Sequence, residues 1–236
     1  MLAASLGLSA GVMIFISLSE LFPEAQAEIA AIGSIKYGEA LTLLAFFGGM
    51  GIIMLIDFLV PEYENPHEAS ELSLSEGYNQ LEHSREKKLH RLGIMSALAI
   101  AVHNFPEGIA TFIGALNDPQ MGASITFAIA IHNIPEGVAV SVPVFFSTGS
   151  KKKAFVYSFL SGLSEPLGAL VGFTILRNFI NDLTFGVVFA MVAGIMVFIS
   201  LDELLPSARE YGEAHLSIYG LISGMVVMAL SLLLFM

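Results

Sequence analysis

The chain has 236 residues, of which 55% are hydrophobic and only 13% are charged, and its mean hydropathy is +0.76. A soluble domain carries roughly 25% charged residues, so the composition excludes an ordinary soluble protein and favours an integral membrane protein. The net charge is −11. The sequence has no cysteine, which excludes disulfides and leaves His, carboxylate, amide and Met groups as metal ligands.

Seven segments are apolar and long enough to cross a bilayer as helices, which takes about 20 residues each. In chain order they are Leu2–Ser19, Ala40–Ile56, Leu92–Leu116, Pro119–Thr148, Ala154–Leu176, Leu183–Leu201 and Leu216–Met236. The sequence therefore predicts an all-α fold, a polytopic membrane helix bundle, with residues 1–236 forming a single transmembrane domain.

The connection 61–91 is the one long polar loop between these segments, and its composition predicts partial disorder. It contains His67, His83 and His90, whose scattered spacing favours an incidental origin over a regulatory metal site. Eight of the ten basic residues lie in this loop and in two later ones, at Arg85, Lys87, Lys88, Arg91, Lys151, Lys152, Lys153 and Arg209. The positive-inside rule places those loops in the cytoplasm, so residue 1 is expected inside.

Two internal repeats relate segments that cross in opposite directions. HNFPEGIA at 103–110 recurs as HNIPEGVA at 132–139, and AGVMIFISLSELFPEA at 10–25 recurs as AGIMVFISLDELLPSA at 193–208. Inverted repeats of this kind are typical of secondary transporters, whose binding site lies at the repeat interface near the midplane.

The repeats also predict a further helix. If the segment at 2–19 pairs with that at 183–201, then the segment at 154–176 has no counterpart. We therefore expect seven spans to be present of eight, with an eighth ahead of residue 1.

The chemistry is concentrated in the HN-x-PEG repeats. His103 and Glu107 stand at positions i and i+4 of one predicted helix and so share a face, and His132 and Glu136 do the same on the next. Imidazole and carboxylate at this spacing can chelate a metal ion. The neighbouring Asn104 and Asn133 could bind a second ion beside the first.

Three acids are predicted deep in the bilayer, where a glutamate costs about 2.5 kcal/mol or more. These are Glu107, Glu136 and Glu165, and no Lys or Arg is expected at their depth. A bound dication would supply the counter-charge. A single His–Glu pair could equally be a packing element, but two copies on neighbouring helices with a third acid favour a metal site.

At these residues the sequence resembles the ZIP family of metal transporters, and most closely its bacterial members. The resemblance covers the whole chain and rests on the two HN-x-PEG motifs and the following Glu165. It implies an eight-helix transporter domain with a binuclear metal site at mid-membrane. One ion would be bound by His103, Glu107, His132 and Glu136, and the other by Asn104, Glu107, Asn133, Glu136 and Glu165; Met13 is a further candidate.

The resemblance implies transport of divalent metal ions into the cytoplasm across a bacterial plasma membrane. Zn²⁺ is the expected substrate, with Fe²⁺, Mn²⁺, Co²⁺ and Cd²⁺ as further candidates, and no cofactor or nucleic acid is expected. The chain could assemble as a homodimer. A metal exporter and an intramembrane metalloenzyme remain alternative functions. The enzyme is disfavoured because no H-E-x-x-H motif is present.

Overall fold

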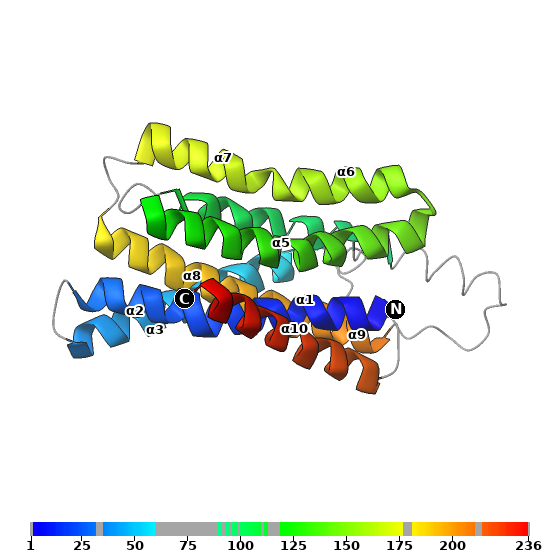
Figure 1. The fold of residues 1–236 in the computed structure, drawn as a ribbon, viewed down its shortest axis with the longest axis horizontal. Helices are drawn as coiled ribbons and strands as arrows, with labels where there is room; N and C mark the ends of the chain where they lie inside the picture. The colour runs from blue at the N-terminus through cyan, green and yellow to red at the C-terminus, as the bar shows by residue number, and fades with distance from the viewer. Residues whose placement is uncertain are drawn as a thin grey trace.

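The computed structural model describes residues 2–31, 35–59, 89–90, 93–94, 96–98, 100–109, 111–112, 119–176, 181–210 and 214–235. The described elements are all helical, which confirms the predicted all-α class. The helices run roughly along the long axis of the molecule (Figure 1). The elements α6 (Lys151–Gly162) and α7 (Ser164–Val171) form an outer layer over α5 (Pro119–Thr148), which packs in turn on α1 (Leu2–Ile16).

Within the residues that the structure describes, five helical stretches are long and apolar enough to cross a membrane, namely Ala3–Ala30, Lys36–Ile56, Lys151–Ile175, Leu183–Glu210 and His215–Leu234. They correspond to five of the seven predicted segments. The helix α5 has the predicted bounds and 30 residues, about 45 Å at the usual rise. Of the segment predicted at 92–116, residues 93–94, 96–98, 100–109 and 111–112 are described and helical, and residues 89–90 are helical ahead of its predicted start.

The predicted carboxyl-terminal ends of two segments are wrong, because the helices continue past Ser19 and Leu201. The first segment continues beyond Ser19 through η1 (Ser17–Leu21) and α2 (Phe22–Ala30). Its repeat continues beyond Leu201 through η3 (Ser200–Leu204) and α9 (Leu205–Glu210). Both extensions carry acids, which lowered their hydropathy without breaking the helix.

The longer repeat adopts one local structure twice, because each copy changes from α to π geometry at the same position. The two π turns end two residues before Pro23 and Pro206, each of which lacks the N–H that an α-helix would use. The N–H of Phe22 donates to the Ser17 carbonyl, five residues earlier, and that of Leu205 donates to the Ser200 carbonyl in the same way. Two similar sequences thus absorb a proline with the same one-residue shift.

The packing of the two repeats is also equivalent. The helix α1 packs on α10 (Ala214–Phe235), and α8 (Asp182–Ile199) packs on α3 (Ile35–Leu59). A Cβ added at Gly11 would overlap the Leu221 carbonyl, and one added at the equivalent Gly194 would overlap the Phe46 carbonyl. The small residues allow backbone contact between helices in both halves.

The main apolar core lies between α1 and α8 and includes Met13 and Met196, both fully buried. This environment favours a packing role for Met13. The predicted loop 61–91 lies outside the described residues except for its last helical positions at 89–90, and the expected eighth helix stays a prediction.

Candidate metal site

A buried imidazole–carboxylate pair joins the two HN-x-PEG helices. His103 Nε2 lies 2.9 Å from Glu136 Oε1, and the two side chains are 0% and 2% exposed. The sequence placed His103 and Glu107 on one face of a helix, and the family resemblance grouped both with Glu136 around one ion. The described contact is the one between helices, from His103 to Glu136.

The carboxamide of Asn104 lies against the same pair. With the amide oriented so that its nitrogen donates, Nδ2 lies 2.9 Å from His103 Nε2, 3.2 Å from Glu136 Oε2 and 3.3 Å from the Ile100 carbonyl. Asn104 is buried, with 1% of its surface exposed. Glu136 on α5 therefore contacts two consecutive side chains of the 100–109 helix, one through each oxygen.

A second polar contact involves Asn133 and Glu165. The Asn133 Nδ2 donates to Glu165 Oε2 across 2.6 Å, which joins α5 to α7. The Asn133 Oδ1 is buried and accepts no hydrogen bond from the described part of the chain. An amide oxygen beside a carboxylate is a donor set that suits a divalent cation.

Two glycines bring Glu165 close to the 100–109 helix. A Cβ added at Gly108 would overlap the Glu165 carbonyl oxygen, and one added at Gly168 would overlap the Phe105 carbonyl oxygen. The two backbones are therefore in direct contact at this crossing. Glycine at both positions is what allows α7 to hold its acid beside the motif helices.

The remaining predicted ligands are placed less completely. Glu107 is buried on the 100–109 helix, with 3% of its surface exposed. The His132 side chain lies outside the described residues, although its backbone belongs to α5. Among the described side chains, no three imidazole or carboxylate groups converge at metal-binding distance. The described part of the candidate site is one His–Glu pair, the two amides of Asn104 and Asn133, and two further acids, Glu107 and Glu165.

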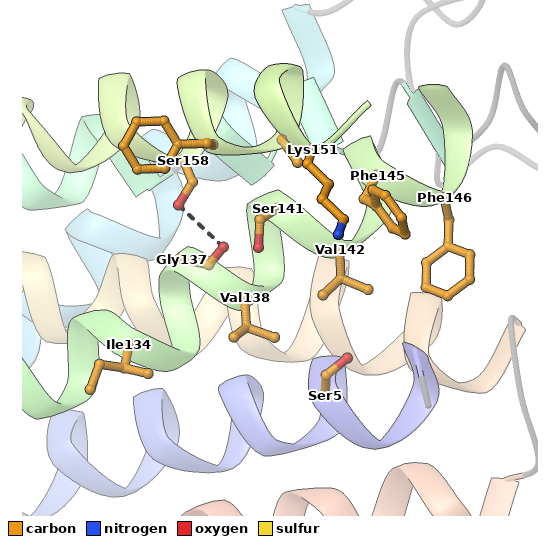
Figure 2. A pocket seen from close by; sticks show the side chains of 12 residues that line it. Ser5, Ile134, Gly137, Val138, Ser141, Val142, Phe145, Phe146, Lys151 and Ser158 are labelled. Atoms are coloured by element: carbon orange, nitrogen blue, oxygen red, sulfur yellow. Dashed lines mark hydrogen bonds between the residues drawn. The ribbon is translucent and has the colours of Figure 1, made fainter. Parts of the chain in front are cut away.

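An open groove of about 690 Å³ lies between α1, α5 and α6, near one end of α6. Figure 2 shows Ser5, Gly137, Ser158 and Lys151 around it, with the Ser158 hydroxyl donating to the Gly137 carbonyl across 3.2 Å. Its lining is largely apolar and includes Ile134, Val138 and Phe155. None of the predicted ligands whose side chains the structure describes lines this groove, so it is distinct from the described part of the candidate metal site.

Serine 9 is a polar residue of this region that the sequence reading missed. It is fully buried on α1, and its hydroxyl donates to the Pro135 carbonyl across 2.6 Å. A hydroxyl in an otherwise apolar segment was the available signal, but an uncharged serine is common in packed membrane helices.

Residues 59–232 match the family model described as "ZIP Zinc transporter". The chain is 58% identical to a protein named zinc transporter ZupT from Clostridium perfringens, covering 99% of this chain and 85% of that protein. It is also 58% identical to the ZupT of Streptococcus mutans and 57% identical to that of Oceanobacillus iheyensis, in each case over 99% of this chain and 86% of the relative.

Proposed function

The chain belongs to the ZIP family of zinc transporters, and on this premise we propose that it carries Zn²⁺ into the cytoplasm across the plasma membrane of a bacterium. It is a multi-pass membrane protein with transporter relatives. The substrate would bind between the two HN-x-PEG helices and α7. The observation that carries this proposal is the buried contact between His103 and Glu136, in a region of the chain that has no lysine or arginine from 92 to 150.

The separation of this pair suits a zinc ion. Zinc bonds to imidazole nitrogen and carboxylate oxygen are about 2.0–2.2 Å long, so a tetrahedral ion needs its N and O ligands about 3.3–3.4 Å apart. The observed 2.9 Å is shorter by only about 0.4 Å. An ion would replace the shared proton, and the imidazole would then bind through Nε2 with its proton on Nδ1.

We propose a binuclear site. The first ion would be bound by His103, Glu107, His132 and Glu136, and the second by Asn104, Glu107, Asn133, Glu136 and Glu165. Support for the second comes from the Asn133–Glu165 contact and from the buried Asn133 Oδ1 beside it. Oxygen ligands of this kind also accept Mn²⁺, Fe²⁺, Co²⁺ and Cd²⁺, so we propose these as further substrates.

The function is tested by reconstituting the purified chain into liposomes that contain a zinc-sensitive dye. A carrier should make the vesicles take up zinc down a gradient, whereas a metalloenzyme or a binding protein should not. The direction of transport is tested in bacteria without other zinc importers. Expression should increase cellular zinc; a decrease would identify an exporter.

The choice of metal is expected to depend on the imidazoles. Changing His103 to Asn should weaken zinc uptake more than manganese uptake, by about tenfold in the ratio of the two, because nitrogen ligands favour zinc whereas oxygen ligands suit manganese. Competitive uptake of the two metals measures the ratio. An equal fall for both metals would show that His103 does not select between them.

A further inference from the structure

We propose that Ser9 is a positioning residue for the metal site, whose hydroxyl holds the Pro135 carbonyl and thereby fixes Glu136 opposite His103. The contact links two helices, α1 and α5, that are far apart in sequence. The inference rests on the proposed function, since it gives Ser9 a role through Glu136.

The hydroxyl of Ser9 lies closer to a carbonyl of α5 than to the carbonyl of Ser5 in its own helix. Buried helical serines commonly donate to the carbonyl four residues earlier. Ser17 and Ser200 do so, at 2.6 and 2.7 Å from the carbonyls of Met13 and Met196. The equivalent distance for Ser9 is 3.1 Å, whereas Pro135 O is 2.6 Å away. Because a hydroxyl has one proton, the shorter contact with α5 is the principal hydrogen bond.

The accepting carbonyl belongs to Pro135, the residue directly before Glu136, so the contact bears on the position of Glu136. Pro135 and Glu136 share a peptide unit, so holding the carbonyl restrains the backbone from which the Glu136 side chain projects. Proline has no N–H, so this turn of α5 lacks one of its usual hydrogen bonds. Ser9 adds a restraint from outside the helix, one residue before the carboxylate that contacts His103.

The second half of the molecule shows that packing does not require this hydroxyl. The longer repeat aligns Ser9 with Val192, one residue before the matching Ala10 and Ala193. Val192 is buried to 2% exposure, as Ser9 is to 0%. A valine therefore fills the equivalent position of the fold, and the hydroxyl at residue 9 is specific to the side of the bundle that contacts α5.

The test compares Ser9→Val with Ser9→Thr in the full chain, because valine and threonine have the same shape and differ in the hydroxyl. Zinc binding is measured by calorimetry and uptake by the liposome assay. S9T should bind zinc more tightly than S9V by about three- to fifteenfold, the range of a hydrogen bond between membrane helices. The zinc concentration for half-maximal uptake should differ likewise, with maximal rates within about twofold.

The same pair of changes at Ser17, whose hydroxyl donates within its own helix, is the control and should show no such difference. Equal zinc affinity for S9T and S9V, or the same difference at Ser17, would overturn the positioning role. The Glu136→Ala variant separates this result from the proposed function. If it binds zinc normally, the site itself is wrong; if it does not bind while S9T and S9V agree, only the role of Ser9 is wrong.

Discussion

Replacing Glu136 with alanine is expected to abolish zinc uptake while the protein still inserts in the membrane. Glu136 is 1% exposed and contacts both His103 and Asn104. It also belongs to both proposed ion shells. Loss of a residue that only hydrogen-bonds to a metal ligand typically costs about 10- to 100-fold in metal affinity or activity. Removing a ligand that both ions share should therefore lower zinc uptake by more than about 100-fold.

The variant should be measured in liposomes beside Glu39→Ala, which removes an exposed acid of α3 and should leave uptake unchanged. Gel filtration in detergent should show whether both variants remain folded, since the change takes away the carboxylate that His103 contacts. Zinc uptake by a folded E136A at the rate of the parent chain would refute the proposed site.

The sequence and the family resemblance grouped the residues proposed for this site, but they did not predict a direct contact between His103 and Glu136. Helical spacing placed His103 and Glu107 on one face, and repetition pointed to a second set at residues 132–136. Which face turns toward which helix depends on packing between segments, and spacing within one helix carries no information on it. The described contact between His103 and Glu136 is therefore a result of the tertiary fold.

The inverted repeat was evident from sequence identity, while its physical basis was not. The glycine at position 11 and its counterpart at position 194 form one of the eleven matching positions. Their role became visible once the Leu221 and Phe46 carbonyls were found against them. Likewise, hydropathy located the ends of apolar stretches, but the helices continue through acidic turns because η1 and η3 absorb Pro23 and Pro206.

Serine 9 shows a different limit of sequence reading. Charged residues in an apolar segment are conspicuous because burying them is costly. A serine has a small cost and can donate to its own helix, so its partner cannot be inferred. The contact with the Pro135 carbonyl required the arrangement of α1 against α5.

Replacing Gly168 with alanine is expected to destabilise the protein and to reduce zinc uptake by about tenfold or more. The added methyl group would overlap the Phe105 carbonyl oxygen, which is a backbone atom and cannot rotate away. The two helices would have to separate, at a cost of about 1–3 kcal/mol, as for other overpacked positions. Separation would move Glu165 away from the motif helices and weaken its 2.6 Å contact with Asn133.

The matched control is Gly162→Ala in the same membrane span, because a Cβ at Gly162 would meet no atom within 4 Å. Alanine is also the better helix former by about 1 kcal/mol, so this variant should melt at or slightly above the temperature of the parent chain and transport normally. Thermal unfolding in detergent and zinc uptake in liposomes measure both effects. Identical behaviour of G168A and G162A would show that the backbone contact does not position Glu165. If G168A loses uptake at an unchanged melting temperature, the loss comes from a changed position of Glu165 and not from a less stable fold.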